Sequence, residues 1–404
     1  MRIVLEAPKT WMDSPLDGER NAVFFANVLA QLCTFNFPIY VREAKYGSDS
    51  YPRYFLPGEI VFSYHTYLDF PLRTPENMGR EGSVFRLKEA PIPPYYSIDS
   101  LGYSGWSSIN FDNKFKDKIN DIPLDKAIEF IENVKETYLT KRISKYPQKN
   151  EQVLDKDYVF FPLQVPDDPV SKLSNINSRE LLEEAVKIAQ EEEVLLLIKR
   201  HPLDNSDLIA EVLELVKGRP FVKFTDGNVI DLVENARSVI AVNSGVSLEA
   251  LYLGASVWNS GKSEWWGAVN KISCLSDVRK AFKKEQPEMQ SFQKKILAFL
   301  VSDFWVRNDD PKSIKNKLKQ CIDSCNKEYL VSEAGYKELL DRLDLSFNEI
   351  LKLSAENNAY QRKLLLAEQL ISFYKNKNGS IKFLLKQLGK EALNRLKKKW
   401  LVKC

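Results

Sequence analysis

The middle of the chain alternates short apolar segments with segments whose apolar residues recur at helical spacing. The apolar segments are mostly continuous, which is typical of parallel strands with helices over both faces of the sheet. Asn177 and Ser178 offer capping oxygens to the first helix, and Gly254 stands where the last helix should end. This alternation predicts a doubly wound α/β domain. The expected strands are 158–163, 194–199, 221–224, 238–242 and 256–258, and the expected helices are 178–193, 207–217, 228–236 and 247–254.

The residues before this region repeat the α/β pattern less regularly. Those between the expected elements are rich in Pro, Tyr and Gly, above all 89–108, which we assign to loops. After Pro287 the pattern is helical to the end of the sequence. The first part should have strands at 3–7, 38–41, 59–63 and 83–87 and helices at 22–32 and 124–140. The expected domains are an α/β domain over 1–150, a second one facing it over 151–285, and a helical region over 286–404.

The overall composition excludes several classes of protein. Of the 404 residues, 44% are hydrophobic and 28% are charged, as in ordinary globular domains. The longest apolar runs, 194–198 and 296–301, are far shorter than the roughly 20 residues of a membrane-spanning helix. The N-terminus does not read as a secretory signal, and five cysteines make a poor disulfide framework. We therefore expect a cytoplasmic protein.

Charge is distributed unevenly along the chain. The formal net charge is +3, but residues 351–404 carry 13 Lys and Arg residues against 3 Asp and Glu residues. Within this stretch, 381–403 intersperses apolar side chains, including Trp400, with basic ones, which is typical of a helix in a membrane interface. We expect peripheral contact with an anionic membrane here and no nucleic-acid partner. Packing of the same apolar stripe on the rest of the protein stays open as an alternative.

Polar side chains follow four consecutive strands of the predicted central sheet, where each strand ends. Because ligands of open parallel sheets bind beyond the carboxyl ends of the strands, these side chains are candidates for a common site. The alternative is that loops are polar in any protein and the convergence carries no function. The candidates are Gln164, Asp167 and Asp168; Lys199, His201 and Pro202; Thr225 and Asp226; and Asn243, Ser244 and Glu249.

Together, these residue types suit a nucleotide-sugar site. Asn243, Ser244 and Gly245 lead into the N-terminus of a helix, where backbone N–H groups and the helix dipole favour a phosphate. Glu249 can accept hydrogen bonds from a ribose. His201 can donate a hydrogen bond to a phosphate or a leaving group, although a lone histidine is more often a structural residue.

The N-terminal half offers a second set of polar residues. His65 follows the strand 59–63 and Glu89 follows the strand 83–87, so both are expected on the wall that faces the other domain. A carboxylate on each wall suits glycosyl transfer, with one carboxylate as nucleophile and the other as acid or base. The alternative is that Glu89 merely pairs with a neighbouring Lys or Arg.

Two kinds of nucleotide site are disfavoured by the sequence. It contains no glycine-rich loop of the dinucleotide or P-loop type. Asp155-Lys156-Asp157 is an Asp-x-Asp triplet, but it precedes its strand instead of following it and is better interpreted as a turn. A metal-dependent nucleotide-diphosphate-sugar enzyme is correspondingly disfavoured. We expect neither a metal nor a cofactor.

Four segments, taken in order, resemble the bacterial β-Kdo transferases of capsular polysaccharide and O-antigen, Kdo being an eight-carbon acidic keto-sugar. They are VFRLKEAPIPPYYSIDSLGYSGWSS from Val84, PLQVPDD from Pro162, IKRHP from Ile198 and VNSGVSLEALYLGASV from Val242. The resemblance covers roughly residues 59–260 and is strongest to the Kdo domains of O-antigen chain-terminating proteins. No single segment is specific, but their combination is.

The resemblance implies a GT-B-like fold, in which two Rossmann-type domains face a cleft, with C-terminal helices added here. It also implies CMP-Kdo as the donor, a lipid-linked glycan as the acceptor, and retention of configuration through a covalent intermediate. By the family pattern Asp168 is the nucleophile, although Asp167 beside it leaves this assignment open by one position. Glu89 matches the acidic residue of the opposing domain, and the donor-binding set is Gln164, Lys199, His201, Pro202, Asn243, Ser244 and Glu249.

Other functions stay open at this point. The donor can be another CMP-sugar, such as CMP-sialic acid, or the chain can be a glycan-binding domain without catalysis. The carboxylate of Kdo also needs a cationic or N–H partner. The sequence does not choose among Lys199, Arg200, Arg73 and Arg86.

Overall fold

The structure is a computed structural model in which residues 1–13, 21–44, 58–73, 83–142, 156–165, 168–202, 212, 214 and 216–325 are described. All of them belong to the first of two compact units, Met1–Val331 and Ser332–Cys404. Asp155, Asp167, most of the expected helix 207–217 and the basic segment 381–403 lie outside the described residues. Among the helices that are described, none is both long enough and apolar enough to cross a membrane.

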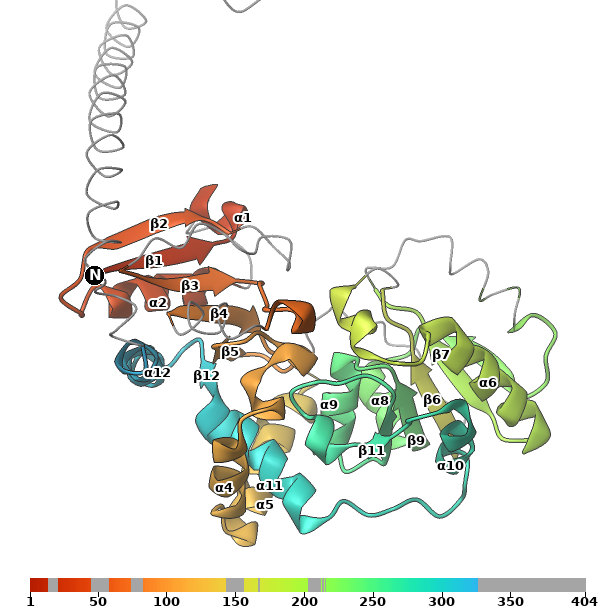
Figure 1. The fold of residues 1–404 in the computed structure, drawn as a ribbon. Helices are drawn as coiled ribbons and strands as arrows, with labels where there is room; N and C mark the ends of the chain where they lie inside the picture. Colours follow the sequence, from red (N-terminus) through yellow and green to blue (C-terminus); the bar gives the residue numbers. More distant parts are fainter. Residues whose placement is uncertain are drawn as a thin grey trace, which may run out of the picture. The chain divides into compact units, whose positions relative to one another are not determined.

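The second half of this unit contains a sheet of parallel strands in the order β11-β10-β9-β6-β7-β8 (Figure 1). This is the strand order of a dinucleotide-binding fold, with the reversal between β6 and β9. The doubly wound α/β domain predicted from the sequence is therefore confirmed. The strands are β6 (Tyr158–Pro162), β7 (Leu196–Lys199), β8 (Val222–Thr225), β9 (Ala236–Ala241), β10 (Val257–Asn259) and β11 (Asn270–Lys271).

Helices cover both faces of this sheet because alternate side chains of each strand enter different cores. Tyr158 and Phe160 of β6 pack with the residues of α8 (Val229–Glu234) and α9 (Gly245–Tyr252). Val159 and Phe161 of the same strand pack with α6 (Ser178–Glu191) and α10 (Val278–Ala281). Gly254 follows α9 in a left-handed conformation, with φ of 83°, as expected for the residue after a helix.

The first half contains a mixed sheet in the order β12-β5-β4-β3-β1-β2 (Figure 1). Strands β1 (Arg2–Ala7), β2 (Ile39–Glu43), β3 (Glu59–Tyr64) and β4 (Val84–Glu89) are parallel, as the sequence predicted. Helices α2 (Ala22–Leu32) and α12 (Pro311–Asp323) share a core with one face of this sheet. The two-sheet α/β architecture is the GT-B-like class predicted above.

Two strands contradict the sequence-based assignment. The stretch 89–108 is not all loop, because Tyr95–Asp99 forms β5 and pairs antiparallel with β4. The chain after Pro287 is not continuously helical either, because Trp305–Arg307 forms β12 and pairs with β5. Both strands are short and flanked by residues with no strand signal, so their partners across the sheet determine them.

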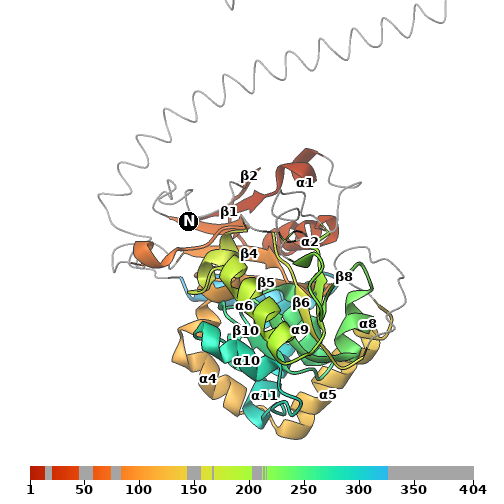
Figure 2. The ribbon, with the colours of Figure 1, turned by 90° about the vertical axis from the view of Figure 1, so that its right-hand side faces the viewer.

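Helices α4 (Asn113–Asn120), α5 (Leu124–Val134) and α11 (Ser291–Phe299) pack together below the first sheet, where both views place them (Figures 1 and 2). The expected helix 124–140 is α5 followed by a π-helical turn, Lys135–Leu139. A second π-helical turn, Leu300–Phe304, joins α11 to β12. The apolar core of these helices is continuous with that under α8 and α9, so residues 286–307 connect the two halves. A short helix α1 (Lys9–Asp13) follows β1.

Candidate functional site

A cavity of about 700 Å³ lies between the carboxyl edges of the two sheets. It is lined by every described residue that the sequence analysis placed in the site, except Thr225 and Asp226. These are Glu89, Gln164, Asp168, Lys199, His201, Pro202, Asn243, Ser244 and Glu249, together with His65. Thr225 and Asp226 at the end of β8 are not part of the lining, so three of the four strand ends named above contribute.

The strand order reverses between β6 and β9, and two amide side chains join the strand ends there. Gln164 Nε2 donates to Asn243 Oδ1 at 2.9 Å, and the Asn243 backbone N–H donates to Gln164 Oε1 at 2.9 Å. Asn243 Nδ2 also donates to the carbonyl oxygens of Val170 and Lys262. Because these bonds occupy both amides, Gln164 and Asn243 fix the shape of the cavity floor.

Ser244 begins α9 at the cavity. Its Oγ accepts a hydrogen bond from the backbone N–H of Val246 at 3.3 Å, which makes it the capping residue of that helix. A Cβ on Gly245 would lie 2.9 Å from Cβ of Pro91, so only glycine lets the two walls come this close. The N-terminus of α9 therefore faces the cavity, where its dipole favours an anion.

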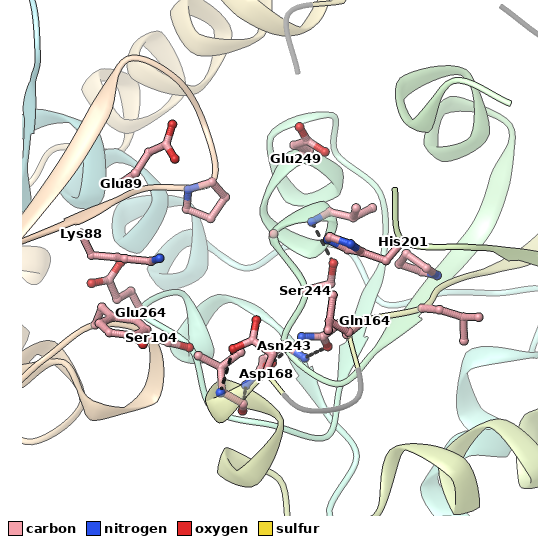
Figure 3. Close-up of a pocket in the computed structure, with 18 of the residues that line it drawn as sticks. Lys88, Glu89, Ser104, Gln164, Asp168, His201, Asn243, Ser244, Glu249 and Glu264 are labelled. Carbon is pink, nitrogen blue, oxygen red and sulfur yellow. Dashed lines mark hydrogen bonds between the residues drawn. The ribbon is translucent and has the colours of Figure 1, made fainter. Parts of the chain in front are cut away.

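His201 and Glu249 lie on the same side of the cavity as Ser244 (Figure 3). His201 follows β7 and is half-buried, whereas Glu249 lies one turn into α9 and is buried. Lys199 ends β7, and its Nζ donates to the carbonyl oxygen of Asp226 at 3.0 Å. This wall thus combines basic side chains, a helix N-terminus and one carboxylate.

Asp168 lies at the start of a 3₁₀ helix, Pro169–Leu173, and is held in place by it. Its Oδ1 accepts from the backbone N–H of Val170 at 3.2 Å, and its carbonyl oxygen accepts from the backbone N–H of Ser171 at 2.9 Å. The carboxylate is thereby oriented by the backbone of its own turn. Figure 3 shows it at the edge of the cavity between the two walls.

The opposite wall comes from the first sheet. Glu89 is the last residue of β4 and is buried, and His65 follows β3 directly in a left-handed conformation with φ of 57°. Nζ of Lys88 lies 3.1 Å from Nε2 of His65 and 5.2 Å from the centre of the Tyr103 ring. Burial raises the pKa of Tyr103, and the nearby charge of Asp168 raises it further.

Glu264 is a cavity residue that the sequence analysis missed. It follows β10, so the same strand-end rule, applied to one more strand, points to it. Its Oε1 accepts from Ser97 Oγ of β5 at 2.9 Å and its Oε2 accepts from Trp305 Nε1 of β12 at 3.0 Å. The side chain therefore joins the second sheet's loop to two strands of the first. Burial, and secondarily the charge of Asp99, raises its pKa to about 8.

Lys88, Ser97, Tyr103 and Trp265 also line the cavity without having been singled out as site residues. Lys88 directly precedes Glu89 in the sequence, Ser97 and Tyr103 lie in the stretch 89–108 that the sequence predicts to be loop, and no sequence motif points to Trp265. Within the described ranges, no group of three or more His, Cys, Asp and Glu side chains is arranged to hold a metal ion.

Comparison with known proteins supports the resemblance to capsule polysaccharide proteins that the four sequence segments indicated. Residues 116–303 match the capsule polysaccharide biosynthesis protein family. The resemblance to capsule polysaccharide proteins is thereby confirmed. Protein FixF of Sinorhizobium fredii is 34% identical over 217 residues, which are 50% of this chain and 48% of that protein. The chain thus spans about half the length of this curated relative.

The solved structures to which this chain shows a distant similarity include two transferases of Thermosulfurimonas dismutans KpsC. The β-Kdo 2,7 transferase has a TM-score of 0.41 at 16% identity, over 79% of this chain and all of that one. The β-Kdo 2,4 transferase has a TM-score of 0.39 at 16% identity, over 74% of this chain and 89% of that one. A UDP-GlcNAc 2-epimerase of Methanocaldococcus jannaschii has a TM-score of 0.35 at 11% identity, over 80% and 99%.

The raised pKa of Glu264 predicts a pH-dependent stability. The folded protein keeps a proton on this group up to about pH 8, whereas the unfolded chain releases it near the ordinary value of 4.5. Its contribution to stability is therefore fully present below about pH 4.5 and is lost as the pH rises through about 8. We expect the melting temperature to fall over this interval, and Glu264→Gln, which cannot ionise, to flatten the curve.

Thermal unfolding between pH 5 and pH 9 measures this effect. The exposed Glu285→Gln removes a carboxylate without touching the cavity and should keep the wild-type slope. Identical slopes for the wild type and Glu264→Gln would show that this side chain is already ionised at pH 5.

Proposed function

We propose that this protein is a retaining glycosyltransferase that moves Kdo from CMP-Kdo to a lipid-linked polysaccharide of the capsule or O-antigen type. One observation carries the proposal. Asp168 and Glu89, which the motif resemblance assigns to catalysis, line the same cavity as the donor-binding set, although the sequence spreads all of them from 89 to 249. The family match over 116–303 supports a role in capsule polysaccharide synthesis.

In this proposal the donor phosphate binds at the N-terminus of α9. Ser244 and the first turn of the helix offer hydrogen-bond donors to it, and His201 on the same wall donates another. Glu249 accepts hydrogen bonds from the ribose. Neutralising the phosphate makes CMP a better leaving group, because the negative charge that develops on its oxygen is stabilised.

The first chemical step forms a bond between a carboxylate oxygen of Asp168 and the anomeric carbon of Kdo. The bond from that carbon to the phosphate oxygen breaks, and CMP leaves with the electron pair. The transition state resembles an oxocarbenium ion, so the negative charge of Asp168 stabilises it before the bond closes. Its hydrogen bond from Val170 N–H fixes the direction of attack.

In the second step a hydroxyl oxygen of the acceptor attacks the same carbon and displaces Asp168. The proton of that hydroxyl passes to Glu89, which acts as the general base from the opposite wall. Two inversions give net retention of configuration. Glu89 ends β4, so the sheet holds its carboxylate at the cavity.

Asp168→Asn tests the nucleophile. An amide cannot form the ester intermediate, so we expect transfer from CMP-Kdo to fall by at least about 10³-fold, with CMP binding and folding preserved. Mass spectrometry of the wild type with CMP-Kdo should show an adduct on the peptide that contains Asp167 and Asp168. The exposed Asp121→Asn is the matched control.

Comparing the two neighbouring positions locates the nucleophile. Asp167→Asn should still form the adduct, whereas Asp168→Asn should not. If Asp168→Asn turned over near the wild-type rate, a double displacement through this residue would be ruled out.

Transfer should also be independent of added metal. In the proposed site, hydrogen bonds from α9 and His201 neutralise the phosphate, so we expect an excess of EDTA to change the rate of transfer by less than about twofold. Loss of transfer in EDTA, with recovery on adding Mg²⁺ or Mn²⁺, would overturn this expectation. The same assay with CMP-sialic acid tests the choice of donor.

A lipid-linked acceptor requires the enzyme to work near a membrane, and we propose that 381–403 makes that contact. Each Lys or Arg near an anionic surface contributes about 1 kcal/mol, and the contribution decreases with salt. The full chain should therefore sediment with anionic vesicles at low salt, and a chain that ends at Asn378 should not. Equal sedimentation of both chains would assign the segment to internal packing.

A further inference from the structure

We propose that Lys88, supported by His65, binds the carboxylate on the anomeric carbon of the donor sugar. The inference rests on the proposed function, because it concerns a donor whose anomeric carbon carries a carboxylate. It assigns this recognition to the wall formed by the first sheet, opposite the wall that binds the nucleotide.

Lys88 belongs to the polar face of the first sheet. Arg86 and Lys88 of β4 pair with Asp99 and Ser97 of β5, and alternate residues of a strand point to the same face. Ser97 on that face donates to Glu264, which places the face toward the second sheet. Figure 3 shows the Lys88 ammonium pointing into the cavity, with Glu89 above it, Glu264 below it and Asp168 across the cavity.

The four cationic residues that the sequence offered as partners of the sugar carboxylate lie elsewhere in the structure. Arg86 is buried and donates to the carbonyl oxygens of Val84 and Ser100, and Arg73 donates to those of Leu68 and Trp106. Neither arginine lines the cavity. Lys199, which ends β7, and Arg200, which follows it, do line the cavity, but on the wall proposed for the phosphate. Among the described lining residues, Lys88 and His65 are the basic groups of the first sheet.

The chemistry of the donor favours a cationic or N–H partner in this place. The carboxylate and the leaving phosphate are bonded to the same carbon, and Asp168 must approach that carbon from the side opposite the phosphate. The carboxylate therefore lies beside this line of attack, within reach of a group close to Asp168 and away from α9. Tyr103 lies near both Asp168 and Lys88. The charge of Asp168 raises the pKa of its hydroxyl, and its ring centre lies 5.2 Å from Lys88 Nζ.

His65 positions the ammonium. Its Nε2 lies 3.1 Å from Lys88 Nζ, and its ring centre lies 5.2 Å from that of Tyr103. A lysine ammonium has three donors, so the contact with the imidazole uses one of them and fixes the direction of the ammonium. In a half-buried site such a charge-assisted hydrogen bond is stronger than one in water.

The proposal predicts a loss that depends on the sugar carboxylate. CMP lacks the carboxylate, so Lys88→Gln should leave its dissociation constant unchanged within about twofold. The same variant should weaken CMP-Kdo binding and raise its KM by about 10- to 100-fold, the range of a hydrogen bond to a charged group. Lys88→Arg, which keeps a cation, should recover part of the loss. Calorimetry with CMP and CMP-Kdo and initial rates with CMP-Kdo measure these effects on the full chain.

Two further variants calibrate the result. Lys283→Gln removes one positive charge from an exposed residue outside the cavity lining and should behave as the wild type. His201→Ala should weaken CMP and CMP-Kdo alike, because it acts on the phosphate. This contrast separates the loss of the carboxylate contact from a general loss of donor binding.

The outcomes separate this inference from the proposed function. If the wild type transfers Kdo and Lys88→Gln keeps its KM, or weakens CMP as much as CMP-Kdo, the carboxylate subsite is wrong and the proposed function stands. If the wild type binds CMP-Kdo more tightly than CMP but transfers nothing, the activity is wrong, and loss of that preference in Lys88→Gln still supports the subsite. A wild type that binds both equally and transfers nothing overturns both.

Discussion

The site depends on two hydrogen bonds between Gln164 and Asn243, which tie the ends of β6 and β9 together. These strands are neighbours in the sheet, and the chain leaves them in opposite directions because the strand order reverses there. The chain after β6 leads to the turn that holds Asp168, and the chain after β9 leads to Ser244 and α9. A single amide pair thus sets the separation between the proposed nucleophile and the proposed phosphate site.

The opposite wall is fixed by contacts that run between the two sheets. Glu264 accepts from Ser97 and Trp305, and Pro91 lies against Gly245. The carboxyl group of Glu264 is buried, and its raised pKa keeps a proton on it near neutral pH. The contact between the two walls therefore buries no unpaired negative charge. Because β12 carries Trp305, the chain must return from the second half to the first before this wall is complete.

The sequence could predict the parts of the fold that are determined locally. Continuous apolar segments such as 158–163 and 238–242 became β6 and β9, and the residues after them line the cavity. Strand β12 and the role of Glu264 could not be predicted in this way. The partners of Glu264 lie 167 and 41 residues away in the chain, and a three-residue strand exists only where another strand pairs with it.

The two walls of the cavity have different roles in the proposed reaction, and they come from different parts of the sequence. The proposed nucleophile and the proposed nucleotide-binding groups fall within 116–303, the segment that matches the capsule polysaccharide family, whereas His65, Lys88 and Glu89 precede it. Recognition of the donor's sugar and activation of the acceptor are therefore assigned to the part of the cavity outside that match. On this proposal a change of sugar or acceptor arises from side chains at the ends of β3 and β4, while the proposed phosphate site at α9 and the turn that holds Asp168 are unchanged.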